Sequence, residues 1–158
     1  MIQKKVCIVG AFAVGKTSLV SRYVRNTFSE KYLTTVGVRI EREAVRAGEH
    51  ELELILWDLH GEDEFQKVRA SYLRGASGCI LVLDRTRPST LETAARMHDA
   101  ARAALGEIPC LYVVNKSDLE DESAIEDTAL GDLRSRGSVV IATSAKTGLG
   151  VKDIDLFE

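Results

Sequence analysis

Short apolar runs alternate with longer amphipathic stretches along the chain. Five runs are rich in leucine and β-branched residues, and they lie at residues 6–9, 52–57, 79–83, 110–114 and 139–142. They are too continuous for strands that have one face in water, and such runs are typical of strands buried on both faces of a parallel sheet. Between them the pattern predicts helices at residues 16–26, 64–74, 89–105 and 122–136, and a short last helix from residue 150.

The longest predicted helix, residues 89–105, shows the helical period most clearly. Pro88 and Ser89 stand at its start, as first-turn and capping residues do. Side chains that recur every three or four residues predict the face that packs on the sheet, namely Leu91, Ala94, Ala95, His98, Ala101 and Leu105.

One segment interrupts the alternation of strands and helices. Residues 36–45 run into Ala47-Gly48-Glu49-His50 and then directly into residues 51–57. Strand, tight turn and strand predict an antiparallel hairpin. We therefore expect an α/β fold with a six-stranded, mostly parallel sheet, one antiparallel edge strand and helices on both faces. Ligands of such sheets bind at the carboxyl ends of the strands.

Composition narrows the class of protein. The length of 158 residues predicts one domain, residues 1–158, and the net charge of −3 argues against a nucleic-acid or anionic-membrane binder. Cys7, Cys79 and Cys110 each lie in an apolar run, which favours buried small side chains over metal ligands. With neither a signal peptide nor an apolar run of about 20 residues, we expect a cytoplasmic location.

The segment Gly10-Ala-Phe-Ala-Val-Gly15-Lys16-Thr17 fits the phosphate-binding pattern G-x-x-x-x-G-K-[ST] and stands between a predicted strand and a predicted helix. Glycines let backbone N–H groups surround an anion, and the helix N-terminus adds partial positive charge. Lys16 can reach the β- and γ-phosphates, and the Thr17 hydroxyl can bind Mg²⁺. Phe12 is bulky for such a loop, and it either points outward or packs against a neighbouring loop.

Residues after the fourth and fifth runs can recognise guanine. The Asp118 carboxylate can accept from N1–H and the 2-amino group of guanine, a pair of donors that adenine lacks. Asn115 can serve the N7 side of the purine or brace the phosphate loop, and the stem of Lys116 can lie on the base. Taken alone, this tetrapeptide also fits an ordinary polar turn. The backbone N–H groups of Ser144-Ala145-Lys146 can meet the guanine carbonyl oxygen.

A second group of residues suits Mg²⁺ and the terminal phosphate. Asp58 ends the second run and can hold Mg²⁺ through water, and the Gly61 N–H can approach a γ-phosphate. The Thr35 hydroxyl can complete the Mg²⁺ shell while its carbonyl contacts γ-phosphate or the attacking water. Phe28 can flank the base. For Thr35 and Phe28 singly, surface and core roles fit equally well.

Five collinear motifs now resemble those of small Ras-like GTPases, namely GAFAVGKT, TTVGV, WDLHGEDEF, NKSD and TSAK. The resemblance covers nearly the whole chain and is closest to the Rab branch. It implies a P-loop GTPase fold that binds GTP or GDP with Mg²⁺, and a molecular switch whose segments at residues 27–37 and 59–74 contact effector and regulator proteins.

The resemblance also implies a set of site residues. The implied catalytic residues are Glu62, Lys16, Gly61 and Thr35. The metal ligands are Thr17, Thr35 and, through water, Asp58. Nucleotide contacts come from Ala13, Val14, Gly15, Lys16, Thr17, Ser18, Phe28, Thr35, Gly61, Asn115, Lys116, Asp118, Ser144, Ala145 and Lys146.

Several positions depart from the Rab pattern, and three of them bear on hydrolysis. Glu62 stands where a glutamine orients the attacking water. A carboxylate can accept a proton from that water, but it is repelled by the transferring phosphoryl group, so the sign of its own effect on the rate stays open. His60 replaces a usual alanine, as an auxiliary acid–base, a partner contact or a plain exposed residue. The Phe12 ring should obstruct an arginine finger inserted by an activator. These departures predict slow intrinsic hydrolysis and a non-standard or absent activator.

The departures at Phe12, His60 and Glu62 leave two functions open, and the end of the sequence leaves open whether the chain is one domain of a larger protein. The last predicted helix is short or truncated, and no prenylation cysteine or membrane anchor follows it in this chain. The first hypothesis is a GTP-hydrolysing switch. The alternative is a nucleotide-dependent scaffold with little hydrolysis, which could be one domain of a larger protein. A nucleoside kinase or ATPase is disfavoured by the guanine-type motifs.

Overall fold

The computed structural model describes residues 2–11, 13–25, 38–47, 49–59, 73–118, 125, 127–135 and 138–151. These residues form strands β1 (Ile2–Gly10), β2 (Val38–Ala47), β3 (His50–Leu59), β4 (Gly78–Asp84), β5 (Cys110–Asn115) and β6 (Val139–Ala142). The helices among them are α1 (Lys16–Arg25), α3 (Ser89–Leu105) and α4 (Asp127–Ser135). All five apolar runs are thus confirmed as strands, most of them longer than the run itself.

The strands form one sheet in the order β2-β3-β1-β4-β5-β6. All neighbours pair in parallel except β2 and β3, which form an antiparallel hairpin closed between Ala47 and His50. The expected mostly parallel sheet with one antiparallel edge strand is therefore confirmed. Strand β1 lies in the middle, with strands on both sides. Because β1, β3, β4, β5 and β6 run parallel, their carboxyl ends share one edge of the sheet.

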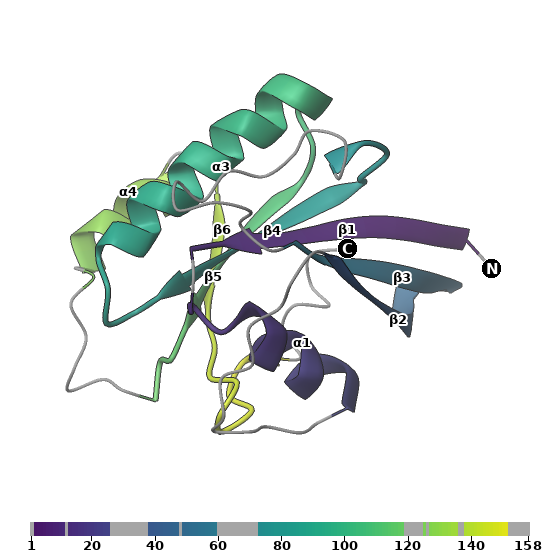
Figure 1. Cartoon of the computed structure of the whole chain (residues 1–158), viewed down its shortest axis with the longest axis horizontal. Coiled ribbons are helices and arrows are strands. Elements are labelled where there is room, and N and C mark those ends of the chain that lie inside the picture. The colour runs from purple at the N-terminus through teal and green to yellow at the C-terminus, as the bar shows by residue number, and fades with distance from the viewer. Residues whose placement is uncertain are drawn as a thin grey trace.

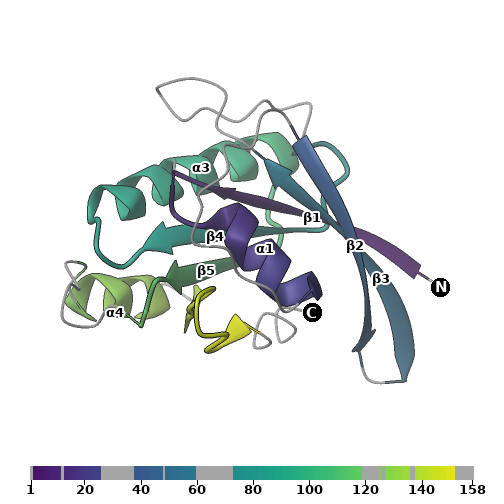
Figure 2. The same cartoon turned by 60° about the horizontal axis from the view of Figure 1, so that its bottom comes forward.

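Helices cover both faces of the sheet (Figure 1). Helix α1 packs on one face, where Leu19, Val20 and Tyr23 meet alternate residues of the central strands. Helices α3 and α4 pack on the other face, on the residues in between. Figure 2 shows α1 crossing in front of β1 and β4, with α3 behind them. The strict alternation along β1, where Val6 and Ile8 face α1 but Cys7 and Val9 face α3, makes both faces apolar.

Helix α3 has the predicted bounds, and its buried face matches the predicted face only in part. The buried residues are Thr90, Thr93, Ala94, Met97 and Ala101. Ala94 and Ala101 were expected there, whereas Leu91, Ala95, His98 and Leu105 are only half-buried. The buried stripe is shifted because the Thr90 hydroxyl turns inward, where the backbone N–H of Asp84 donates to it at 3.0 Å. The spacing of apolar residues cannot predict this hydrogen bond between Asp84 and Thr90.

The remaining helical predictions are only partly covered. Helix α1 covers all the described residues of the predicted range 16–26, and α4 covers residues 127–135 of the predicted range 122–136, where the other described residue, Ile125, is not helical. Most of the helix predicted at residues 64–74 and almost all of that predicted after residue 150 lie outside the described residues. No helix in the described ranges is long and apolar enough to cross a bilayer.

The three cysteines form a row across the face that α3 covers. Cys7 pairs with Cys79 in the β1–β4 register, and Cys79 pairs with Cys110 in the β4–β5 register. Cys7 and Cys79 are fully buried as expected, but Cys110 is only half-buried, because it begins the β5 strand at the margin of the core. Burial raises the pKa of Cys7 to about 11. A hydrogen bond with Cys110, together with burial, holds the pKa of Cys79 well above its usual value.

These environments predict selective alkylation of one thiol. Iodoacetamide at neutral pH should modify Cys110 in the folded protein and spare Cys7 and Cys79, because the reactive species is an accessible thiolate. Peptide mass spectrometry before and after unfolding measures the labelling of each site. Cys110→Ser should abolish labelling of the folded protein. Equal labelling of the three thiols would contradict the burial of Cys7 and Cys79.

Candidate functional site

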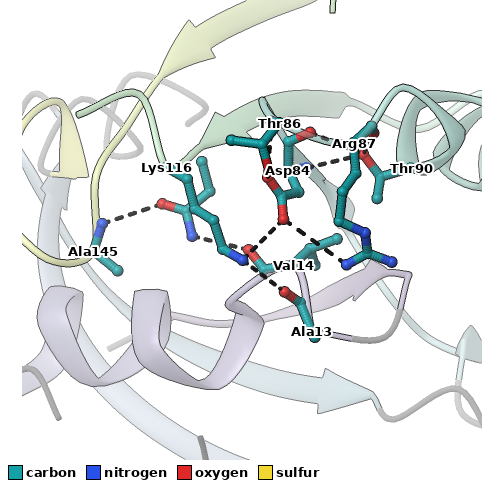
Figure 3. Close-up of polar contacts among 9 residues, drawn as sticks. Ala13, Val14, Asp84, Thr86, Arg87, Thr90, Lys116 and Ala145 are labelled. Carbon is teal, nitrogen blue, oxygen red and sulfur yellow. Dashed lines mark hydrogen bonds and ion pairs between the residues drawn. The ribbon is translucent and has the colours of Figure 1, made fainter. Parts of the chain in front are cut away.

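Segments at the carboxyl ends of the parallel strands meet at one edge of the sheet. The segment after β1 leads into α1, Asp58 lies near the end of β3, and residues 116–118 and 143–146 follow β5 and β6. Side chains from these loops contact one another although they are far apart in sequence, as the close-up in Figure 3 shows for the loops after β1, β4, β5 and β6. The predicted position of the site at this edge of the sheet agrees with this convergence.

The backbone from Ala13 to Gly15 has the form of an anion cradle. Ala13 and Gly15 both have positive φ, of 61° and 95°, which turns successive N–H groups toward the concave side. Helix α1 begins at Lys16, and its first backbone hydrogen bond runs from Leu19 N–H to Gly15 O at 2.8 Å. The helix N-terminus therefore points its unpaired N–H groups at the same place.

Gly15 is required for a second reason. A Cβ atom at this position would lie 2.5 Å from Nδ2 of Asn115, in addition to the strain of a φ of +95°. The loop can therefore approach Asn115 closely only because residue 15 has no side chain. This contact is the first of several between the phosphate-type loop and the segment after β5.

Lys16, Thr17 and Asp58 form a charged group beside the cradle. Lys16 is 92% shielded from water, since only 8% of its surface is exposed, and burial lowers its pKa while Asp58 partly opposes that effect. The Thr17 hydroxyl donates to Oδ2 of Asp58 at 2.7 Å. Asp58 is itself buried, and its Oδ1 has no hydrogen-bond partner among the residues described.

This group fits a bound Mg²⁺ ion. A buried carboxylate oxygen without a described partner is costly, and a hard cation with its water shell would satisfy it. The Thr17 hydroxyl lies next to it and offers the second oxygen ligand that this metal prefers. A desolvated lysine alongside matches a polyanionic ligand, because a nearby phosphate would restore the stability of its charged form.

Asn115, at the end of β5, holds the loops after β1 and β6 against the loop that follows it. Its Nδ2 donates to the Val14 carbonyl at 3.0 Å, and its Oδ1 accepts from the Thr143 hydroxyl at 3.2 Å and from the Ala145 N–H at 3.1 Å. The residue is 2% exposed, so these bonds form without competition from water. The hydrogen bond to Val14 is the bracing contact that the sequence offered as one of two roles for Asn115.

The other three residues of the tetrapeptide, Lys116, Ser117 and Asp118, make separate contacts. Lys116 has a φ of 62°, and its Nζ donates to the Ala13 carbonyl at 3.1 Å. The Ser117 hydroxyl donates to Val114 O at 2.8 Å and closes the turn. Asp118 is exposed, with Oδ1 accepting from the Ser144 hydroxyl at 2.8 Å. An exposed carboxylate that is held by the Ser144 hydroxyl can accept the two donors of a guanine edge.

The loop after β6 is held from two sides. The Ser144 N–H donates to Leu149 O at 2.9 Å, and the Ala145 N–H is taken by Asn115. The expected contact of the Ala145 N–H with the guanine carbonyl therefore requires that this N–H be shared with Asn115 or released from it. On the other side, Arg22 of α1 donates to Ala145 O at 2.8 Å and to Lys146 O at 2.7 Å.

Three residues of this network were missed in the sequence. Arg22 and Asp84 belong to no motif, and Thr143 stands in TSAK but was given no role; each acts on a residue that is distant in the chain. The position of Asp84 was the available signal, since it ends a buried strand as Asn115 does. The predicted site residues Phe28, Thr35, Gly61 and Glu62, together with Phe12 and His60, lie outside the described residues.

Comparison with known proteins agrees with this geometry. The Ras family profile matches residues 5–157. The chain is 32% identical to the Ras-related protein Rab-7b of Mus musculus over 154 residues, which are 95% of this chain and 77% of that protein. It is 34% identical to the Ras-related protein RABA5e of Arabidopsis thaliana over 152 residues, 94% of this chain and 69% of that protein.

A third relative is the Ras-related protein Rab-7L1 of Rattus norvegicus, 38% identical over 129 residues, which are 78% of this chain and 63% of that protein. The resemblance to the Rab branch is therefore confirmed, and the scaffold alternative is not favoured. Together with the cradle, the lysine and the buried carboxylate, the match over nearly the full chain shows that this protein belongs to the Ras family, a GTP-binding and GTP-hydrolysing molecular switch.

Proposed function

We propose that this single domain, residues 1–158, alternates between GTP-bound and GDP-bound states, with Mg²⁺ in the site and slow intrinsic hydrolysis. The observation that carries the proposal is the buried junction of Asn115 with Val14 and Ala145, which fixes the base-side loops against the phosphate-side loop. A nucleotide spans both sides of such a junction, with its phosphates at the cradle and its base between residues 116–118 and 143–146.

Each part of the site has its own task toward the ligand. The N–H groups of residues 13–18 would surround the phosphates, with the Lys16 ammonium as the buried counter-charge. Thr17 and Asp58 would hold Mg²⁺, which when bound neutralises phosphate charge. Asp118 would accept from the guanine edge, and the Ser144 hydroxyl holds that carboxylate in place.

The proposed slow rate rests on Glu62 and Phe12, which the resemblance to the family assigns to the γ-phosphate side of the site. A carboxylate at Glu62 repels the transferring phosphoryl group, whereas the usual glutamine carries no charge. The Phe12 ring would occupy the space into which an activator inserts an arginine. With Gly61 and Thr35 as the remaining contacts to the terminal phosphate, we propose turnover that depends little on a Ras-type activator.

Partners and location follow from membership of the family. We propose that effector and regulator proteins bind the segments at residues 27–37 and 59–74, which respond to the γ-phosphate. Nucleic acid is not proposed as a partner, because the net charge of −3 gives no electrostatic drive toward a polyanion. Three free cysteines support a reducing, cytoplasmic environment.

Base selectivity provides the first test. The protein as purified should carry GDP or GTP, identified by extraction and chromatography. Asp118→Asn should weaken GDP binding about tenfold or more and shift preference toward xanthosine diphosphate, because the amide now offers a donor to the guanine donors. Competition against a fluorescent GDP analogue measures both affinities.

The matched control for this test is Asp132→Asn. Asp132 is an exposed aspartate on α4, so the same chemical change there should leave the affinities for both nucleotides unaltered. ADP that displaces bound GDP as well as unlabelled GDP does would disprove guanine recognition, and unchanged selectivity of the Asp118 variant would remove that residue from the site.

Hydrolysis provides a second test, by single turnover of preloaded GTP. Glu62→Gln should raise the intrinsic rate, since the charge that repels the phosphoryl group is removed. Phe12→Gly should raise the rate obtained with an arginine-finger activator. Glu92→Gln, an exposed glutamate in the first turn of α3, is the control and should behave as wild type. If neither site variant alters the rate with or without an activator, the explanation through Glu62 and Phe12 is wrong.

A further inference from the structure

Asp84, the last residue of β4, is a fully buried carboxylate next to the nucleotide site. It lies beside Asn115 in the β4–β5 register, so it shares the edge where the site loops begin. The Lys116 ammonium donates to its Oδ2 at 2.8 Å, and the Arg87 guanidinium lies 3.8 Å from the same oxygen. Figure 3 shows the Lys116 side chain between this carboxylate and the backbone of Ala13.

One ammonium group thus connects two loops. Nζ of Lys116 reaches Oδ2 of Asp84 and, at 3.1 Å, the carbonyl of Ala13 in the phosphate cradle. Lys116 and Ala13 are also the two non-glycine residues with positive φ within the described ranges. Such a backbone conformation costs a non-glycine residue free energy and persists where surrounding contacts hold it. The contact through the lysine joins the two strained positions directly.

The carboxylate is held rigidly from its other side. Oδ1 of Asp84 accepts from the backbone N–H of Thr86 at 2.9 Å and from the Thr86 hydroxyl at 2.6 Å. Burial raises the pKa of Asp84, but the hydrogen bonds from Lys116 and Thr86 outweigh burial and bring the pKa below its usual value. Asp84 therefore stays ionised at physiological pH and faces Lys116 as a fixed negative charge.

A role in stability alone explains this arrangement poorly. Buried ion pairs often contribute little to stability over apolar residues of the same size, because desolvation offsets their attraction. Here the cation continues to a carbonyl of the phosphate loop instead of ending at the pair. Without the carboxylate, the long and flexible side chain of Lys116 would have one anchor fewer and would hold Ala13 less often.

We propose that Asp84 is a positioning residue of the nucleotide site, which acts through Lys116 to hold the base-side loop against the phosphate loop. The inference rests on the proposed function, since it concerns retention of a guanine nucleotide in that site. Asp84 touches no ligand in this mechanism. Its effect appears in how long the nucleotide stays bound.

The test measures the release of a fluorescent GDP analogue in a double-mutant cycle. Asp84→Asn keeps the shape of the side chain but removes its charge, and it should speed release about tenfold or more. In a Lys116→Met background the same change should alter release by less than about twofold, because the partner through which Asp84 acts is gone. If Asp84 had a purely structural role, independent of Lys116, the fold-changes in release rate of the two single variants would multiply in the double variant.

The matched control is Asp99→Asn, which makes the same substitution on α3. Asp99 is an exposed aspartate, with a side chain 77% exposed and 3.8 Å from Arg102. This variant should release the analogue at the wild-type rate. Release from Asp84→Asn that matches wild type, or an Asp84 effect undiminished in the Lys116→Met background, would overturn the proposal.

Two further outcomes are decisive. If wild type itself binds no guanine nucleotide, the proposed function and this inference fail together, whereas tight wild-type binding with no Asp84 effect refutes the inference alone. If Asp84→Asn does not fold, the side-chain ammonium of Lys116 can be followed by nitrogen-15 NMR in GDP-bound wild type. Its hydrogen exchange should be slowed relative to the exposed Lys4, and exchange as fast as that of Lys4 would overturn the proposal.

Discussion

The carboxamide of Asn115 is the contact on which the arrangement of the site depends. A single planar group donates to the loop after β1 and accepts from two groups of the loop after β6, all within the protein interior. An aspartate would lose the donor to Val14, and a glutamine would be one methylene too long for an enclosed space beside Gly15. Because buried polar groups are costly when unpaired, displacement of any one loop would leave this amide unsatisfied, and the three loops are therefore held as one unit.

The sheet makes that contact possible. Strands β1, β4 and β5 are almost wholly buried where they approach the site, so their ends are fixed by packing on both faces. Parallel neighbours in register bring Asp84 beside Asn115 and Gly10 beside Val82 without help from the loops. Gly10 is needed here because a Cβ would lie 2.6 Å from the Val82 carbonyl. Loops that begin from such fixed points need few further contacts to take up a defined shape.

The sequence was a good guide wherever chemistry is confined to neighbouring residues. Continuous apolar runs predicted the strands, and Gly10 to Thr17 predicted the cradle, because spacing along the chain sets those geometries. It was a poor guide where a residue contacts another that is distant in the sequence. Nothing around Asp84 or Arg22 indicates that one meets Lys116 and the other the loop after β6, since both contacts depend on strand order. The buried face of α3 was misplaced for the same reason, because Thr90 turns inward toward the end of β4.

The two outer strands of the described sheet differ in how they discourage association with other chains. The sequence of β2, VRIEREAVRA, places a charge at five of its ten positions, and Arg42 pairs with Glu53 at 2.9 Å on the hairpin. An approaching strand would have to match those charges in order and desolvate them. At the opposite edge, β6 is apolar and its Val139 is 56% exposed, but only four residues long. Charged side chains on β2 and the short length of β6 thus both make it difficult for another strand to pair with an edge of this sheet, which leaves the sheet a poor template for aggregation.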